Sequence, residues 1–282
     1  FRQLSSFIHK DFKNKKDIPH IPRFIETELD KVSYKTMVEF AKDQGFITAC
    51  TPFDEESVDL IEDLEIELIK IASCSANDYP LLKRLKASKL PVLASTGGLT
   101  LNEIDVLVDN FEHRESGFAL HHCVSIYPTP MQNLNLNQIK LLKKRYPDIG
   151  IGWSTHEDPD DTDYIMIAAA CGATMFERHV GLETEKYKLN NYSSTPKQIK
   201  KWLESYTKAL KALGGINRPP AQELEKKALS SLHRGVYVNK KVEKDEKIYK
   251  DNIYFAMPAQ EGQLTAGKFK EKLQSKFDLS VD

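Results

Sequence analysis

Two hydrophobic patterns alternate along the first three quarters of the chain. Short apolar runs rich in β-branched residues predict strands buried on both faces, at residues 45–50, 68–72, 91–94, 118–124, 149–153 and 174–180. Longer amphipathic stretches between them predict helices, at residues 57–64, 80–87, 100–109, 135–146, 159–171 and 196–213. The predicted strands begin at intervals of roughly 25 residues, which is typical of repeated βα units and a parallel sheet.

Six such units in a row favour a (β/α)8 TIM barrel over an open doubly wound sheet. No glycine-rich dinucleotide fingerprint follows a predicted strand, and Gly97-Gly98 is the only glycine pair at a strand end. A complete barrel has eight strands, whereas residues 1–30 contain no convincing strand. We therefore expect the first strand–helix–strand to be missing from this sequence, and we assign residues 1–215 to the barrel domain.

The pattern changes after the last predicted helix. Gly214-Gly215 ends that helix, and Pro219-Pro220 marks a linker over residues 216–224. Short strands and turns follow, with strands expected at Gly235–Val238, Lys247–Ile248 and Ile253–Ala256. Residues 225–282 are therefore predicted to form a small second domain rich in β-structure.

The overall composition is that of an ordinary globular protein. The 282 residues include 40 basic and 41 acidic side chains, so the net charge of -1 suggests neither a nucleic-acid nor a membrane partner. No apolar run approaches the length of a membrane span, and no signal peptide opens the chain. The four cysteines form no C-x-x-C pair, which favours free, mostly buried thiols in a cytoplasmic protein.

Polar side chains gather where the predicted strands end, which is where βα barrels place their catalytic groups. These positions carry Thr51, Lys70, Ser73, Ser95, His122, Ser125, Tyr127, Ser154, His156 and residues 177–179. One lysine among apolar neighbours, ringed by hydroxyls, predicts a site for a compact anion such as phosphate or carboxylate. The histidines His156 and His179 come from adjacent strands and can share a divalent metal, leaving positions for water or a substrate oxygen.

Each of these residues also has a simpler interpretation. A serine or threonine after a strand is usually a helix cap, Lys70 can be a solvated lysine at the rim, and a lone histidine more often has a structural role. The joint pattern, present at five of the six strand ends, is what favours a functional site.

Ordered motifs at these strand ends carry a resemblance to a known family. They are Thr51-Pro52-Phe53-Asp54, Lys70-Ile71-Ala72-Ser73, Ala94-Ser95-Thr96-Gly97, His122-Cys123-Val124-Ser125-Ile126-Tyr127-Pro128, Gly152-Trp153-Ser154-Thr155-His156 and Glu177-Arg178-His179. The set resembles the sialic acid synthase family, whose members include synthases of legionaminic and pseudaminic acids. These enzymes condense phosphoenolpyruvate with an N-acetylated hexose such as N-acetylmannosamine into a nine-carbon 2-keto sugar acid for surface polysaccharides, and phosphate is released. Residues 232–237 and 258–262 are similar to the family's antifreeze-like (SAF) domain.

The resemblance implies a role for each matching residue. It places Lys70, His156 and His179 among the catalytic residues and Tyr127 beside the acceptor sugar. It implies that the two histidines bind Mn²⁺ or Mg²⁺. The phosphoenolpyruvate pocket would comprise Lys70 with Thr51, Ser73, Ser95, Ser125 and Ser154. Because the family's small domain covers the active site of a second subunit, the resemblance also implies a domain-swapped homodimer.

The departures from the family pattern lie on the acceptor and metal side. The family's metal-site glutamate and its Lys-x-Gln motif would precede Phe1, so weak or absent activity is expected if this is the whole protein. Leu189-Asn190 stands in place of an aspartate–histidine pair, and Met257 in place of an arginine before Pro258. These changes favour a modified acceptor, such as a diamino sugar.

Two other functions stay open. Another phosphoenolpyruvate–aldose condensing synthase, such as a keto-deoxy-octulosonate phosphate synthase, would need basic residues for the phosphate of its acceptor and would not carry the small tail domain. A non-catalytic sugar- or anion-binding barrel protein would keep the pocket without the N-terminal catalytic strand.

Overall fold

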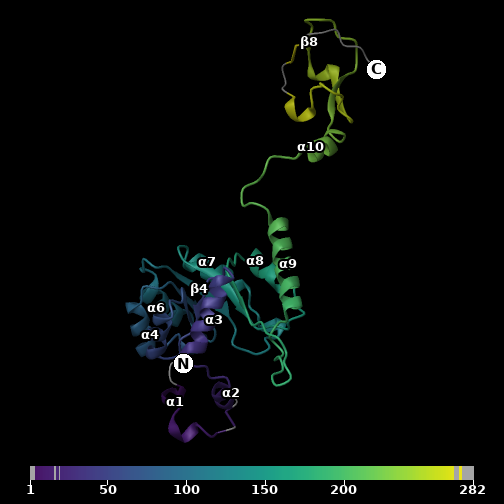
Figure 1. Cartoon of the computed structure of the whole chain (residues 1–282). Helices are drawn as coiled ribbons and strands as arrows, with labels where there is room; N and C mark the ends of the chain where they lie inside the picture. Colours follow the sequence, from purple (N-terminus) through teal and green to yellow (C-terminus); the bar gives the residue numbers. More distant parts are fainter. Residues whose placement is uncertain (1–3, 16, 19, 270–272, 275–282) are drawn as a thin grey trace. The chain divides into compact units, whose positions relative to one another are not determined.

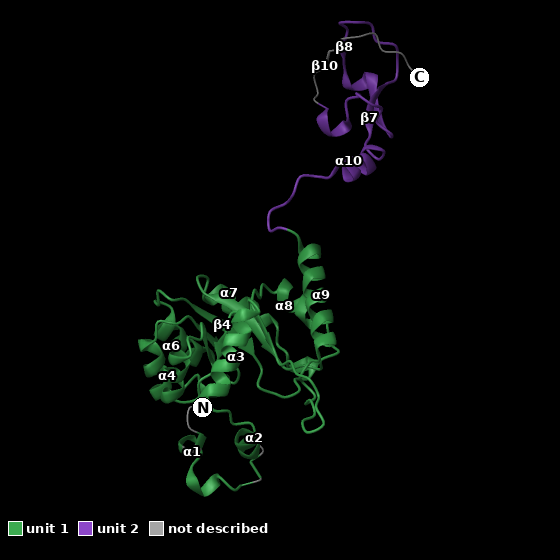
Figure 2. Ribbon diagram, in the orientation of Figure 1, with its two compact units in different colours: residues 1–214 green, residues 215–282 purple. Residues whose placement is uncertain are grey.

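The computed structural model describes residues 4–15, 17–18, 20–269 and 273–274. The chain divides into two compact units, residues 1–214 and residues 215–282 (Figure 2). All of the predicted βα segments fall in the first unit. The candidate site residues from Thr51 to His179 therefore belong to one unit.

The first unit is built on one parallel sheet of six strands (Figure 1). The strands follow one another across the sheet in chain order, and each pairs in parallel with its neighbours. They are β1 Ala49–Cys50, β2 Leu68–Ile71, β3 Val92–Ser95, β4 Phe118–Cys123, β5 Gly150–Thr155 and β6 Phe176–Arg178. The prediction of an α/β fold with a parallel sheet is confirmed.

A helix follows each strand, as the amphipathic stretches predict. These are α4 Glu55–Asp63, α5 Tyr79–Ala87, α6 Leu101–Phe111, α7 Asn137–Arg145, α8 Tyr164–Ala170 and α9 Pro196–Leu213. Three more helices precede the sheet: α1 Leu4–Phe7, α2 His20–Glu26 and α3 Lys31–Asp43. Capping side chains fix several of the starts, since Asp54 accepts from the Ser57 N–H at 2.7 Å and Thr100 forms a capping box with Glu103. In the described part of the chain, no helix is long and apolar enough to cross a membrane.

The main core lies between the sheet and its helices. Strand residues Ile69, Ile71 and Ile151 are almost fully buried, and Leu85, Phe111 and Ile139 from the helices belong to the same cluster. Alternate residues of the strands face away from the helices, and many of these are polar. This second face carries the candidate site.

The sheet is strongly curved, as one long-range contact shows. Lys70 on β2 and Glu177 on β6 are four strand positions apart, which would separate their backbones by roughly 19 Å in a flat sheet. Their side chains nevertheless meet, with the ammonium nitrogen 3.1 Å from a carboxylate oxygen. The inner faces of β2 and β6 therefore turn toward one another, which is the curvature that a barrel requires.

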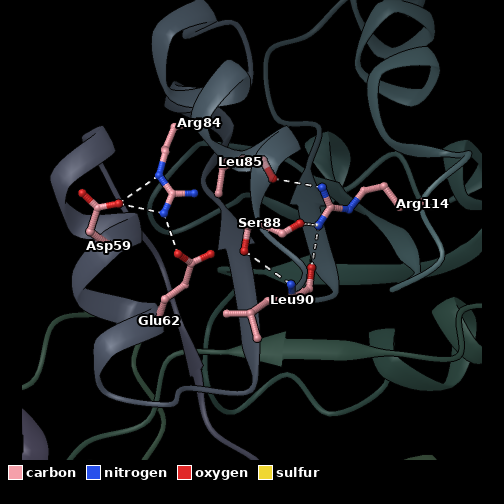
Figure 3. A network of polar contacts seen from close by, with 7 residues as sticks. All are labelled: Asp59, Glu62, Arg84, Leu85, Ser88, Leu90 and Arg114. Carbon is pink, nitrogen blue, oxygen red and sulfur yellow. Dashed lines mark hydrogen bonds and ion pairs between the residues drawn. The ribbon is translucent and has the colours of Figure 1, made fainter.

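Two arginines join the outer helices, and one of them also reaches the loop before β3 (Figure 3). Arg84 on α5 donates to Asp59 and Glu62 on α4, at 2.7 and 2.5 Å. Arg114 donates to the carbonyl oxygens of Leu85 and Leu90, each at 2.9 Å, and also to that of Ser88. The Arg114 bonds tie the segment after α6 to the end of α5 and to the loop before β3.

The second unit contains α10 Glu223–Ser230 and two small antiparallel ladders. One ladder pairs β7 Gly235–Val238 with β9 Ile253–Ala256, and the other pairs β8 Lys247–Ile248 with β10 Leu273–Gln274. The three strands expected in this region are present with the predicted bounds. Helix α10 and strand β10 were not expected, and α10 lies across the expected boundary between linker and β-rich domain.

All four cysteines are free thiols, as expected. Cys123 and Cys171 are buried and Cys50 is half-buried, whereas Cys74 is exposed. The exposed thiol directly follows Ser73, in the short 3-10 helix Ser73–Ser75 that comes after β2.

Candidate active site

Lys70 is the centre of a buried polar network on the inner face of the sheet. Only 8% of the residue is exposed, which excludes a solvated lysine at the rim. Its ammonium group donates to Ser95 Oγ at 2.6 Å and lies 3.1 Å from the Glu177 carboxylate. Ser154 donates to the same carboxylate at 3.2 Å. The network thus joins β2, β3, β5 and β6 near their carboxyl ends.

Glu177 is the counterion of this network. Burial would raise the pKa of its carboxyl group, but the neighbouring His121 and the charge of Lys70 outweigh burial and lower the pKa to about 2. The group is therefore a carboxylate at neutral pH. With 41% of its side chain exposed, Glu177 also borders the open side of the site. The sequence places Glu177 at a strand end but does not indicate this role.

His121 lies against Glu177 and was not singled out by the sequence. The residue is 1% exposed, and its Nδ1 is 3.5 Å from a Glu177 oxygen. Neither ring nitrogen has a hydrogen-bond partner in the part of the chain that the structure describes. Gly152 makes room for the ring, because a Cβ at this position would lie 2.4 Å from the ring carbon Cδ2.

The neighbouring His122, which the sequence did indicate, lies on the other face of β4. Its Nε2 is 2.8 Å from the carbonyl oxygen of Leu134, so its role is structural. The alternation of side chains along a strand is the signal that identifies His121. In the sheet His121 pairs with Ser95 and with Gly152, so the three positions face the same side.

Two serine hydroxyls converge on Gly97, which follows β3. The Gly97 N–H donates to Ser73 Oγ at 3.0 Å. A Cβ on Gly97 would lie 2.7 Å from Ser73 Oγ and 2.3 Å from Ser125 Oγ. A side chain at this position would displace both hydroxyls, so glycine lets two of the hydroxyls expected in the anion site lie together around it.

The family resemblance implies a phosphoenolpyruvate pocket at these hydroxyls, and on that basis we expect Gly97→Ala to weaken phosphoenolpyruvate binding at least tenfold, which corresponds to about 1.4 kcal/mol. The added methyl group forces the Ser73 and Ser125 hydroxyls apart. Isothermal titration calorimetry measures the change, and Gly215→Ala is the matched control, because a Cβ there meets nothing within 4 Å. Equal affinities for the two variants would contradict the assignment of these serines.

The two candidate metal ligands lie side by side. The rings of His156 and His179 are 5.3 Å apart between centroids. His156 Nδ1 is 3.2 Å from the carbonyl oxygen of Val124, so Nδ1 donates and Nε2 keeps its lone pair. Burial lowers the pKa of His156 to about 4 and also lowers that of His179. Both rings are therefore neutral at pH 7, the form that binds metals.

Two tyrosines border this pair. The Tyr127 ring lies 4.2 Å from the His156 ring, and Tyr192 lies 5.1 Å from both Tyr127 and His179. Tyr192 reaches the site through a loop whose ends meet in a parallel bridge between Val180 and Ser194. Residue spacing alone does not reveal Tyr192, because this bridge is what returns the loop to the strand end.

Thr51 has different surroundings from the other candidate residues. It lines a cavity of about 170 Å³ together with Leu4, Phe24, Thr27, Glu28, Leu29, Tyr34 and Phe53. Most of these residues belong to the segment that precedes β1. The structure thus associates Thr51 with the N-terminal helices, while Lys70, Ser95 and Ser154 meet at Glu177.

A metal at this site would have two protein ligands among the residues described. These residues contain no group of three His, Cys, Asp or Glu side chains arranged to hold an ion by themselves. The neutral imidazoles of His156 and His179 are nevertheless suitable donors for a divalent metal. The pair thus fits an ion whose other ligands are water and substrate oxygens.

The comparisons with known proteins agree with the family resemblance that the strand-end motifs carry. Residues 5–218 match the model of the NeuB family. Over 206 residues the chain is 34% identical to the N-acetylneuraminate-9-phosphate synthase of Drosophila melanogaster, covering 71% of this chain and 53% of that protein. It is 29% identical over 238 residues to the N,N'-diacetyllegionaminic acid synthase of Campylobacter jejuni, covering 82% of this chain and 70% of that protein.

A solved structure supports the same relationship. A Chromobacterium violaceum protein described as a spore coat polysaccharide biosynthesis protein E matches with a TM-score of 0.95 and 45% identity, covering 100% of this chain and 84% of that one. The family resemblance expected from the strand-end motifs is confirmed. Since the family model covers most of its residues, the chain belongs to the NeuB family.

Proposed function

We propose that this protein condenses phosphoenolpyruvate with an N-acetylated hexose, giving a nine-carbon 2-keto sugar acid and inorganic phosphate. The observation that carries the proposal is the buried Lys70 network beside two neutral histidines, at the carboxyl ends of a curved parallel sheet in a member of the NeuB family. Kinship to synthases of sialic and legionaminic acids supports an amino-sugar acceptor.

Lys70 and the serine hydroxyls form the part of the proposed site that binds phosphoenolpyruvate, the donor substrate. Buried, preorganised donors stabilise an anion more strongly than solvated ones, because they need not reorganise as charge develops. Lys70 Nζ already shares its bonds between Ser95 and Glu177, so a phosphate or carboxylate entering here competes with Glu177 for the ammonium group. Ser73 and Ser125 supply further hydroxyl groups around Gly97.

The acceptor side comprises the two histidines and the two tyrosines. His156 and His179 would hold Mn²⁺ or Mg²⁺, whose Lewis acidity polarises the carbonyl oxygen of the acceptor. In the reaction, C3 of phosphoenolpyruvate bonds to the aldehyde carbon, water adds at C2, and the C–O bond to phosphate breaks. Tyr127 and Tyr192 flank the histidines and would limit which acceptor enters.

The second unit completes the proposal. Residues 232–237 and 258–262 resemble an antifreeze-like domain, and in such synthases this domain covers the active site of a neighbouring subunit. We therefore propose a domain-swapped homodimer, in which residues 225–282 contribute to the acceptor side of the partner's site.

Phosphate release from phosphoenolpyruvate tests the function directly. The acceptor panel contains N-acetylmannosamine, diamino relatives of it, and aldose phosphates, each with and without Mn²⁺. Release that depends on an N-acetylated hexose supports the proposal. Release with aldose phosphates alone would indicate the other class of synthase, and binding of phosphoenolpyruvate without release would indicate a binding protein.

We expect His156→Ala to reduce metal-dependent phosphate release to background while phosphoenolpyruvate still binds. The substitution removes one of two imidazole ligands and leaves the Lys70 network untouched. An assay of phosphate release measures the loss of turnover, and calorimetric titration with phosphoenolpyruvate measures binding separately. His113→Ala is the control because its side chain is 83% exposed. A rate equal to that of the control would remove His156 from the metal site.

A further inference from the structure

We propose that His121 is a positioning residue that takes up a proton when an anion binds at Lys70, and that its imidazolium then pairs with Glu177. The inference rests on the proposed function, because it takes Lys70 to be the donor site. It adds His121 to that site, and it couples the binding of phosphoenolpyruvate to the protonation of His121.

The charge balance at Lys70 motivates the proposal. Before a ligand binds, the ammonium group of Lys70 is neutralised by Glu177 at 3.1 Å. An arriving phosphate or carboxylate takes over hydrogen bonds of Lys70 and adds negative charge beside the Glu177 carboxylate. Two anions close together in a partly desolvated site repel each other strongly, so the bound state gains from one more positive charge next to Glu177.

His121 is placed to supply that charge. Its Nδ1 lies 3.5 Å from Glu177 Oε2, and its side chain is 2% exposed. Neither ring nitrogen meets hydrogen-bond geometry among the described residues, and Nδ1 lies within ion-pair distance of Glu177, so a proton gained by the ring has this carboxylate to pair with. Its in-register neighbours Ser95 and Gly152 carry no charge, so Glu177 on β6 and Lys70 on β2 are the charged groups that act on it.

The same contacts explain why the proton arrives with the ligand. In the unliganded site, burial lowers the pKa of His121, and repulsion from Lys70 adds to this, against the attraction of Glu177. An anion bound at Lys70 cancels that repulsion and adds an attraction of its own, so binding raises the pKa of the ring. By linkage, a group whose pKa rises on binding takes up protons, and anion affinity then falls as pH increases.

Calorimetry of phosphoenolpyruvate binding tests the coupling. The titration is run without metal at pH 7.5, in several buffers with different ionisation enthalpies, and the slope gives the number of protons taken up. His121→Gln keeps the polarity of the side chain, and His121→Leu fits its buried surroundings, so at least one folded variant is expected. We expect both to take up fewer protons than the parent, by roughly half a proton or more per site.

The adjacent histidine provides the matched control. His122 is also buried on β4 but bonds to the Leu134 carbonyl on the opposite face, so His122→Gln should bind phosphoenolpyruvate with the proton uptake of the parent protein. Equal proton uptake in the parent and in the His121 variants overturns the inference while leaving the donor site intact. Absence of phosphoenolpyruvate binding in the parent overturns both the donor site and the inference.

Discussion

Replacing Lys70 with methionine is expected to lower kcat/KM for phosphoenolpyruvate about a thousandfold, the upper range for loss of one preorganised donor to a developing anion. Methionine keeps the unbranched stem of lysine as far as Cε and removes the charged ammonium group. The substitution removes the only cation bonded to Ser95 and Glu177 in the described network. The effect exceeds that of a surface charge because the ammonium group is buried and water cannot replace it.

Two further variants separate catalysis from folding. The Lys70→Met variant leaves the Glu177 carboxylate without its cation, so a double variant with Glu177→Gln should recover stability without recovering phosphate release. Lys83→Met on helix α5 serves as a surface control. The measurement is kcat/KM from phosphate release under limiting phosphoenolpyruvate, together with thermal unfolding. A Lys70→Met enzyme that kept a tenth of the parent's kcat/KM would refute the role given to this lysine.

The hydrophobic pattern predicted most of the first unit because parallel strands covered by helices are continuous apolar runs. It overestimated strand length at the edges. Residues 45–50 were expected to form a strand, but only Ala49–Cys50 pairs with β2. Helix α10 was missed because it follows a proline-rich segment, and eight residues give too few turns for a clear period.

The sequence predicted the site residues that follow from their positions at strand ends. It did not predict the contacts that arise because the sheet is curved. Lys70, Ser95 and Ser154 were expected together, and the structure brings all three to the Glu177 network. Glu177 is the counterion of Lys70 because β2 and β6 approach one another, and local sequence cannot predict this long-range contact. Strand alternation did contain the signal for His121, since it shares a face with Ser95.

The second large effect is expected at Arg178, which forms a buried ion pair with Glu157. Both side chains are 1% exposed. The guanidinium also donates to Ser194 Oγ at 2.5 Å and to the Glu157 carbonyl at 3.3 Å, and it lies 5.5 Å from the Trp202 ring. Removing one member of such a pair leaves a buried charge without compensation, so Arg178→Met should lower the free energy of unfolding by about 3–5 kcal/mol.

The position of this pair links stability to the candidate metal site. Glu157 directly follows His156, and Arg178 directly precedes His179. The ion pair therefore joins the two backbone segments that carry the histidines. The Ser194 contact ties in the loop that presents Tyr192. Loss of the pair should thus loosen the histidines as well as destabilise the first unit.

Urea unfolding followed by tryptophan fluorescence measures the effect, because Trp153 and Trp202 are both buried in the first unit. The control is Arg145→Met, since the ion pair of Arg145 with Asp105 is partly exposed and such pairs contribute at most about 1 kcal/mol. A double variant, Arg178→Met with Glu157→Leu, replaces both charges with apolar groups and should regain most of the lost stability. If Arg178→Met lowered the free energy of unfolding by no more than Arg145→Met does, the buried pair would not be what holds β5 and β6 together at the histidines.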